Sequence, residues 1–564
     1  MKNLLLSLLV VFLLLPDATL SASRKPVKAK NGMVVSADPL ATQAGLEVLK
    51  QGGNAVDAAV AVGFALAVTY PAAGNIGGGG FMNIRMSDGR MAAIDYREKA
   101  PGAAYRDMFL DSTGTFLPDK STEGHLASGV PGAVAGMLTG LERFGTMDRK
   151  KVIAPAYRLA KDGFPLLQDL ADDLNWGRQT FLKFPGSTRY FVSKDSAYRE
   201  GELWKQTDLA KTLKRIMDKG KDGFYKGTTA DLIVAEMKRG GGMISHADLA
   251  AYEAVIREPL RGTYRGYEII SQPPVSSGGT ALLQLLNILE GYDLRSYGHN
   301  SAATLHRYIE AMRRVYADRA EHLGDPAFYD VPVAGLTSKE YAVLRRATID
   351  TMRASRSSEI SHGTPPKREK EETTHYSVVD RWGNCVSVTT TINGGFGSFV
   401  AVDGAGFLLN NEMDDFSAKP GVPNMFGALG NIANEIQPDK RMLSSMTPTI
   451  VTKDGKPFMV IGTPGGTTII TTVMQVICNV IDFEMNIQQA IDAPRIHHQW
   501  SPDMTYFERR GLSADTADKL RSMGHTLNER RGSSGLAEGI IIDTERGLLF
   551  GATDPRGYGL AAGY

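Results

Sequence analysis

Apolar and polar positions alternate along two neighbouring runs near the middle of the chain. The first run covers residues 373–380 and the second covers 385–391, and both are rich in β-branched residues. A polar turn, 381–384, separates them. Alternation with period two is typical of strands, and a short polar turn between two such runs favours a hairpin. The pattern therefore predicts a β-hairpin over residues 373–391.

The segment before this hairpin, 353–372, has the opposite character. It consists almost entirely of charged and small polar residues, with Ile360 as its one large apolar side chain. Such a segment buries too little apolar surface to hold a fixed fold, so we expect it to be flexible. If the chain were cut before Thr373, that residue would carry a hydroxyl nucleophile and a free α-amine to activate it. A flexible linker followed by an ordinary strand is the alternative interpretation.

Helical patterns surround the hairpin on both sides. Residues 55–69 are apolar nearly all round, which predicts a buried helix, and Asn54 is placed to cap it. Residues 32–36 read as a strand and 41–50 as an amphipathic helix. Further strands and helices follow at 261–271, 280–289, 447–452, 458–463 and 467–480. Strands that alternate with helices along the chain predict an α/β protein with layered sheets.

Composition excludes several classes of function. The chain has 564 residues, 43% hydrophobic and 22% charged, with a net charge of +1. A near-zero charge argues against nucleic acid or an anionic membrane as the main partner. The sequence has no zinc-binding motif, no phosphate-binding glycine loop and no serine hydrolase elbow, so we expect neither a metal nor a cofactor. The two cysteines, Cys385 and Cys478, are expected to be buried free thiols, with a disulfide as the alternative.

The N-terminus has the features of a secretory signal. Lys2 precedes an apolar run from Leu4 to Leu15, and small residues at 21–23 form a cleavage site. The apolar run is short for a membrane span, although an uncleaved anchor is the alternative. We therefore expect residues 1–23 to be removed and the protein to be exported to the periplasm or the medium.

Several motifs together resemble the γ-glutamyltranspeptidase family. They include the run 373–380, the Thr391-Ile392-Asn393 end of the hairpin, and residues 410–417. Residues 96–101, 273–279, 443–449, 462–466, 493–499 and 554–556 also match in family order. The resemblance covers nearly the whole chain after the signal, which makes chance agreement untenable.

This resemblance implies an N-terminal nucleophile hydrolase fold, an αββα sandwich made from a precursor that cuts itself. The cut would fall between Glu372 and Thr373. It would leave a large subunit, 24–372, with the flexible segment 353–372 at its end, and a small subunit, 373–564, the two forming one composite domain. Thr373 would attack the γ-amide carbonyl, and the γ-glutamyl ester would pass to water or to an amino acid or dipeptide acceptor.

The resemblance also assigns roles in the site. Arg97, with Ser444 and Ser445, would bind the substrate α-carboxylate, a geometry that suits a guanidinium. Glu412, Asp415 and Asn393 would bind the α-ammonium. Gly465 and Gly466 would form the oxyanion hole, and Thr391 would contact the amine of the nucleophile. The loop 419–441 resembles a lid over the glutamyl pocket, although Phe426 stands where a tyrosine is expected.

Two other functions remain open at this point. A cephalosporin (glutaryl) acylase of the same fold is one, and an unprocessed, inactive homologue that serves as a binding protein is the other. The pair of acidic side chains expected for an ammonium argues against the first. The intact Thr373 and glycine pair argue against the second.

Overall fold

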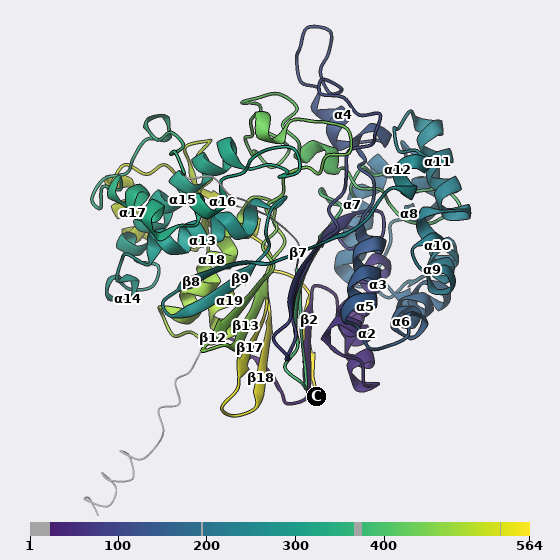
Figure 1. Cartoon of the computed structure of the whole chain (residues 1–564), viewed down its shortest axis with the longest axis horizontal. Helices are drawn as coiled ribbons and strands as arrows, with labels where there is room; N and C mark the ends of the chain where they lie inside the picture. Colours follow the sequence, from purple (N-terminus) through teal and green to yellow (C-terminus); the bar gives the residue numbers. More distant parts are fainter. Residues whose placement is uncertain (1–22, 193–195, 366–374, 531) are drawn as a thin grey trace, which may run out of the picture.

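Two antiparallel sheets face each other, and helices cover the outer face of each (Figure 1). The computed structural model describes residues 23–192, 196–365, 375–530 and 532–564. In spatial order, the first sheet contains β1 (Val27–Ala29), β18 (Leu548–Thr553), β17 (Glu538–Asp543), β13 (Lys456–Gly462), β12 (Thr449–Lys453), β9 (Tyr267–Ser271) and β8 (Leu260–Tyr264). The second contains β19 (Leu560–Gly563), β2 (Gly32–Ser36), β10 (Tyr376–Asp380), β11 (Cys385–Thr391), β3 (Gly79–Arg85), β4 (Met91–Asp95) and β7 (Val255–Arg257).

Helices pack on both outer faces. The larger layer covers the second sheet and includes α2 (Pro39–Lys50), α3 (Ala55–Thr69), α5 (Ala133–Phe144), α6 (Arg149–Asp162), α7 (Gln168–Phe181), α8 (Pro185–Phe191), α9 (Thr207–Lys219), α10 (Asp222–Tyr225) and α11 (Thr228–Gly240). The other layer covers the first sheet and includes α13 (Ser277–Leu289), α15 (Ala302–His322), α17 (Lys339–Ala347), α18 (Thr468–Ile481), α19 (Ile487–Asp492) and α20 (Ala514–Ser522).

Smaller elements complete the described chain. The short helices are α4 (Pro118–Thr122), α12 (His246–Ala250), α14 (Leu294–Tyr297) and α16 (Val333–Leu336), and the 3₁₀ turns are η1 (His125–Ala127), η2 (Ser357–Glu359), η3 (Glu412–Asp415) and η4 (Ile432–Asn434). Minor sheets join β14 (Ile496–His497), β15 (Thr505–Glu508) and β16 (Leu527–Arg530), and separately β5 (Phe164–Pro165) and β6 (Leu203–Trp204).

Strand alternation divides the apolar core into layers. In β10, Val378 packs against the helices of the second sheet, whereas Val379 points between the two sheets. In β12, Val451 packs against the helices of the first sheet, and Ile450 points between the sheets. Successive side chains of a strand point to opposite faces, so one strand contributes to two layers at once. The layers therefore run helix, sheet, sheet, helix.

The predicted hairpin lies at the centre of the second sheet. Tyr376 of β10 is paired with Val388 of β11, and β2 and β3 flank the pair on either side. Because β2 and β3 come from the first hundred residues, segments far apart in the sequence meet in one sheet. The hairpin prediction is confirmed over the residues described.

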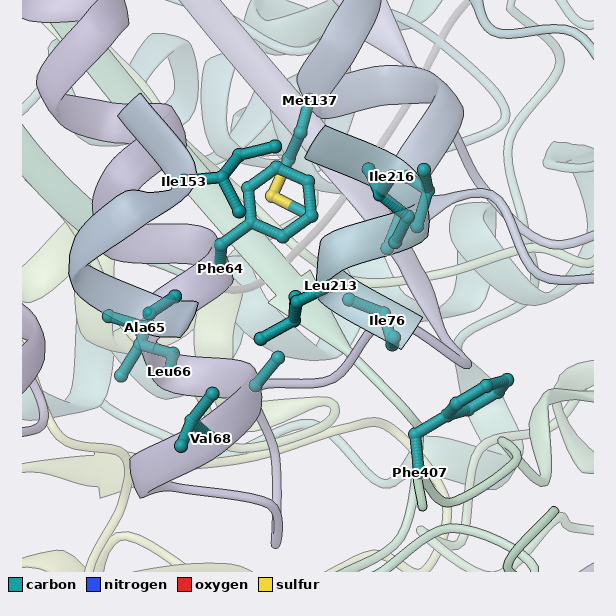
Figure 2. Packing of buried hydrophobic residues seen from close by; sticks show 14 of the residues in the cluster. Phe64, Ala65, Leu66, Val68, Ile76, Met137, Ile153, Leu213, Ile216 and Phe407 are labelled. Carbon is teal, nitrogen blue, oxygen red and sulfur yellow. The ribbon is translucent and has the colours of Figure 1, made fainter. Parts of the chain in front are cut away.

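The predicted all-apolar helix is also confirmed. Every residue of α3 is buried, and Asn54 and Asp57 form a capping box at its start. Figure 2 shows the packing around this helix, where Phe64 lies near Met137 of α5 and Ile153 of α6. A helix without a polar face is stable only when it is enclosed on all sides.

Residues 353–365 differ from the expected flexible segment. The backbone N–H of Ala354 donates to the carbonyl of Met523 at 2.7 Å, and the indole of Trp500 donates to the carbonyls of Ser357 and Ile360. These hydrogen bonds hold residues 353–365 against the rest of the protein. The number of apolar residues in the segment does not predict such bonds. Residues 366–372 lie outside the described residues, so the expectation of flexibility there stays a prediction.

Both cysteines are buried free thiols, as expected. Within the described residues, no helix combines the length and the apolar character needed to cross a bilayer. The predicted signal, 1–23, falls outside the described residues except for Ser23.

Candidate active site

A cavity of about 190 Å³ opens where strands of both sheets end. It lies between the loops after β4, β11 and β13, which bring together residues far apart in the sequence. Its lining includes these residues that the sequence analysis selected: Arg97, Thr391, Asn393, Glu412, Asp415, Ser444, Ser445, Gly465 and Gly466. Glu372 and Thr373 lie outside the described residues, so their positions stay predictions.

Arg97 follows β4 directly and is fully buried. Its guanidinium lies 2.5 Å from a carboxylate oxygen of Glu412 and 2.6 Å from one of Asp415. Glu98 is also buried, and its carboxylate lies 3.6 Å from the same guanidinium. Glu412 and Asp415, both in η3, therefore contact Arg97, which we expect to bind the substrate carboxylate. With Glu98, three carboxylates surround the Arg97 guanidinium.

Burial controls the protonation of these acids. It raises the pKa of Glu98 to about 8, because the Arg97 guanidinium offsets only part of the desolvation. Burial likewise raises the pKa of Glu412 well above its usual range, and that of Asp415 above its ordinary value. The three acids thus share more negative charge than their surroundings stabilise, which favours a site that receives a cation.

A second arginine reaches the cavity from α15. The Arg319 guanidinium donates to the hydroxyl oxygens of Ser277 and Ser445, each at 2.9 Å. The Ser277 hydroxyl in turn donates to the backbone carbonyl of Ser444. The two predicted serines are therefore tied to a positively charged group, which makes this wall suitable for a carboxylate.

The glycine pair lies between β13 and α18. Gly465 has φ of 135° and Gly466 has φ of 57°, so both occupy backbone regions that disfavour other residues. A side chain on Gly466 would meet the ring of Phe426 at 2.8 Å. The turn at Gly465 and Gly466, where we expect the oxyanion hole, therefore requires glycine both for its backbone conformation and because a side chain on Gly466 would clash with Phe426.

The end of β11 places two more predicted residues on the wall. The backbone N–H of Asn393 donates to the Thr391 hydroxyl at 2.7 Å, and the Asn393 amide donates to the carbonyl of Asn411 at 3.0 Å. His375, just before β10, hydrogen-bonds with the hydroxyls of Ser377 and Ser387. Burial lowers the pKa of His375 to about 3, so this imidazole stays neutral at ordinary pH.

The loop 419–441 lies over the cavity. The Asn424 amide donates to a carboxylate oxygen of Asp415 at 2.9 Å, and the backbone N–H of Met425 donates to Asp414 at 2.9 Å. Phe426 lines the cavity beside Gly466. The loop is therefore anchored to the acidic turn that it covers.

Sequence reasoning missed Glu98 and Arg319 as parts of the site. Glu98 lies in the motif 96–101, which carries the family resemblance, so its position next to Arg97 could have marked it as part of the site. Arg319 lies on a long charged helix whose pattern does not distinguish a buried arginine from a solvated one. Only the packing of α15 reveals it.

The αββα layers, with the strand that follows the predicted nucleophile at the centre, define an N-terminal nucleophile hydrolase fold. The sequence profile described as Gamma-glutamyltranspeptidase matches residues 41–564. The chain is 51% identical over 543 residues to the glutathione hydrolase proenzyme of Escherichia coli (strain K12), covering 96% of this chain and 93% of that one.

Solved structures agree with this. A cephalosporin acylase from Bacillus halodurans is similar with a TM-score of 0.87 and 31% identity, covering 98% of this chain and 99% of that chain. The γ-glutamyltranspeptidase of Helicobacter pylori gives a TM-score of 0.58 at 46% identity, covering 61% of this chain and 96% of that chain. This chain belongs to the γ-glutamyltranspeptidase family. The predicted family and fold are confirmed.

Proposed function

We propose that this protein is a self-processing γ-glutamyltransferase and glutathione hydrolase. One observation carries the proposal: predicted residues from position 97 to position 466 line a single cavity, whose lining includes Arg97, Arg319, Glu412 and Asp415, with the buried Glu98 next to Arg97. A γ-glutamyl group presents an α-carboxylate and an α-ammonium next to the amide to be cleaved. A wall with arginine and serine and a wall with excess carboxylate match these two charges.

The mechanism begins with a cut between Glu372 and Thr373. The Thr373 hydroxyl then attacks the γ-amide carbonyl, and its own α-amine takes the proton. Backbone N–H groups of Gly465 and Gly466 stabilise the oxyanion, a contribution of about 2.7–4 kcal/mol per donor in related chemistry. The γ-glutamyl ester passes to water or to an amine acceptor.

The Arg97 cluster supplies substrate recognition in this proposal. Arg97 and the Ser444–Ser445 wall bind the α-carboxylate, while Glu412, Asp415 and Asn393 accept hydrogen bonds from the ammonium or orient it. Glutathione, other γ-glutamyl compounds, and amino acid or dipeptide acceptors are the expected small-molecule partners. The two subunits of the precursor stay together because each sheet contains strands from both.

The decisive experiment is mass spectrometry of the purified protein with an assay of glutathione hydrolysis. We expect two fragments, the smaller beginning at Thr373, and expect Thr373→Ala to remain one inactive chain. An intact chain with full activity would refute the mechanism. A correctly exported wild-type protein without turnover would instead support the inactive binding homologue.

The acylase alternative has one specific observation in its favour, the similarity to a cephalosporin acylase. Glutaryl groups lack the α-ammonium, however, so the acidic cluster around Arg97 favours a glutamyl group. Parallel assays with γ-glutamyl and glutaryl anilides separate the two functions. Faster hydrolysis of the glutaryl compound would overturn the preference.

Export is part of the proposal. Residues 1–23 have the pattern of a signal, and removal of this segment would deliver the enzyme to the periplasm or the medium. Fractionation of cells and N-terminal sequencing of the large fragment test it. A large fragment that starts at Met1 would contradict the cleaved signal.

A further inference from the structure

One exposed methionine lies at the edge of the site. Met413, Met442 and Met446 belong to segments that form the cavity wall, and each is at most 4% exposed. Met425, in the loop 419–441, is 46% exposed and lines a second cavity, of about 470 Å³. Small solutes therefore reach the Met425 side chain without entering the first cavity.

The sulfur of Met425 lies beside two side-chain amides. The amide nitrogens of Asn393 and Asn411 are each 3.7 Å from it. The Asn393 amide also donates to the backbone carbonyl of Asn411, and the Asn411 amide donates to that of Thr122, which fixes the nitrogen end of each amide on this side. A thioether is a weak hydrogen-bond acceptor, so a stronger acceptor at the same place would bind these donors more tightly.

Asn393 connects the sulfur to the reaction site. It lines the first cavity, and it is one of the residues that we expect to hold the substrate ammonium. The backbone N–H of Met425 donates to Asp414 at 2.9 Å, and Asp414 precedes Asp415 of the Arg97 cluster. A chemical change at the sulfur therefore affects the Asn393 amide and the loop over the cavity together.

Two thiols and one further exposed methionine are the sulfur atoms to compare with Met425. Cys385 and Cys478 are fully buried, and burial raises the pKa of Cys385 to about 12, so this thiol is not ionised at neutral pH. Among the residues that the structure describes, Met352 is the other exposed methionine, at 70%, and it lines neither cavity. Met425 therefore combines exposure with contact to a residue of the site.

We propose that Met425 is an oxidation site, where a hydroperoxide converts the thioether to a sulfoxide whose oxygen accepts hydrogen bonds from the Asn393 and Asn411 amides. The inference rests on the proposed function, because its effect on turnover is an effect on the same glutamyl pocket. Oxidation makes the side chain polar and draws the Asn393 amide toward the loop. The oxidised enzyme binds the substrate ammonium less well.

The oxidation is balanced in atoms and electrons. A lone pair of the Met425 sulfur attacks the terminal oxygen of the hydroperoxide, an S–O bond forms and the O–O bond breaks. The proton of that oxygen passes to the departing oxygen, which leaves as an alcohol, or as water when hydrogen peroxide is the oxidant. The sulfur gives up an electron pair and the peroxide gains one. Sulfoxide formation is reversible by the methionine sulfoxide reductases.

The test treats the processed enzyme with hydrogen peroxide. Peptide mapping by mass spectrometry measures the sulfoxide at each methionine, and kcat/KM for γ-glutamyl-p-nitroanilide is measured in the same samples. We expect kcat/KM to fall about 10-fold in step with oxidation of Met425, the size expected for a hydrogen bond to a charged ligand. Reductases for both sulfoxide epimers, with dithiothreitol, should restore it.

Three variants separate Met425 from other targets of peroxide. Relative to its own untreated activity, Met425→Leu should lose less than about twofold, since leucine keeps the apolar volume and has no sulfur. Met352→Leu is the matched control and should lose as much as the wild type. Met425→Gln carries an oxygen acceptor near the position of the sulfur. Without peroxide, its kcat/KM should be about fivefold below that of Met425→Leu.

A Met425 side chain that stays reduced while Met352 is fully oxidised would overturn the proposal. So would a fully oxidised Met425 with unchanged kcat/KM, or inactivation of Met425→Leu at the wild-type rate. In all three cases the untreated enzyme still turns over, so the proposed function survives. A wild-type enzyme that is cut before Thr373 and has no turnover would refute the proposed function, while peptide mapping would still test the oxidation.

Discussion

Two clusters of buried charge occur in this protein, and they differ in how well their charges are balanced. On α15, the single carboxylate of Glu310 lies between the guanidinium groups of Arg313 and Arg314, at 3.3 Å and 2.7 Å. At the cavity wall, Arg97 is shared by the carboxylates of Glu412 and Asp415, which line the cavity, and of Glu98, which is buried beside it. Arg319, also on the cavity wall, is the next cation.

The pKa values follow this balance. Burial opposes ionisation of Glu310, but Arg313, the Ser355 hydroxyl and Arg314 hold its pKa below the usual value. In the cavity, burial raises the pKa of Glu98, Glu412 and Asp415. A balanced cluster serves the fold, whereas one that lacks positive charge is prepared for a ligand that supplies it.

The α15 cluster also has a structural task. The Ser355 hydroxyl donates to Glu310 at 2.6 Å, and Arg313 donates to the Ser357 hydroxyl at 2.5 Å. Asp503 accepts from the Ser357 backbone N–H at 2.7 Å and pairs with Arg313. These bonds attach residues 355–357, which precede the expected cut, to α15 and to Asp503, which follows the cut in the sequence.

The largest effect is expected when the cation of the cavity cluster is removed. Arg97→Gln leaves the carboxylates of Glu98, Glu412 and Asp415 without their main partner and removes the group that we propose binds the substrate carboxylate. We expect kcat/KM for glutathione to fall about 1,000-fold, since loss of one partner of a buried pair costs about 3–5 kcal/mol. Steady-state kinetics measures it, with Arg97→Lys as the control that keeps the charge. A Gln variant with nearly normal kcat/KM would remove Arg97 from recognition.

Breaking the balanced cluster should affect stability and spare catalysis. Glu310→Gln removes the carboxylate that Arg313 and Arg314 share and leaves only Asp503 beside Arg313, so we expect the free energy of unfolding to fall by about 3 kcal/mol. Thermal unfolding of the processed enzyme measures this, and kcat/KM of the folded protein should change less than about twofold. Glu484→Gln, in an exposed pair with Arg295, should cost less than about 1 kcal/mol. If Glu310→Gln lost much of its kcat/KM but kept normal stability, the α15 cluster would serve catalysis and not the fold.

A third change removes one of the excess carboxylates. The pKa of Glu98 is about 8 in the folded protein and near 4.5 when unfolded, so the folded state binds more protons between these values. The contribution of Glu98 to the free energy of unfolding is therefore complete below pH 4.5 and is lost as the pH rises through about 8. In Glu98→Gln the side chain does not titrate, so the variant does not lose stability in this way.

The unfolding free energy of the variant minus that of the wild type should thus increase between pH 5 and 8, by up to about 3–4 kcal/mol. Thermal unfolding at several pH values gives this difference. Parallel curves for the two proteins would show that Glu98 does not titrate in this range.

The smallest effect is proton release when glutamate binds. An ammonium next to Glu412 and Asp415 lowers the pKa of the cluster, so we expect up to about one proton released per glutamate at pH 7. Calorimetry in two buffers of different ionisation enthalpy measures the number. Glutarate, which lacks the ammonium, is the matched ligand and should release fewer protons. Equal release by both would contradict an ammonium site.

Much of the fold could be predicted from local patterns. The α3 helix and its Asn54 cap, the strand β2 and the hairpin β10–β11 were found because each depends on residues close in sequence. Helix α13 begins at Ser277, three residues before the predicted start, because the Ser276 hydroxyl accepts from the Gly278 backbone N–H and caps it. Boundaries depend on such caps, which an apolar pattern does not register.

The site was predicted in a different way. Its residue list came from motifs in family order, and the tertiary structure places those described around one cavity. Their chemical roles stay predictions until the variants are made. Glu98 and Arg319 were missed because their importance comes from burial and, for Arg319, from partners 42 and 126 positions away, which no local pattern contains.

The sequence alone determined several helices and strands, the family and nine of the residues that line the cavity. It did so because hydrophobic period, capping residues and motifs are local properties of the chain. Only the tertiary structure decided that the cavity cluster is unbalanced while the α15 cluster is balanced. The reason is physical: the pKa of a buried acid depends on how many charges lie within a few ångströms in space, and those charges come from strands, turns and helices that meet only in the folded protein.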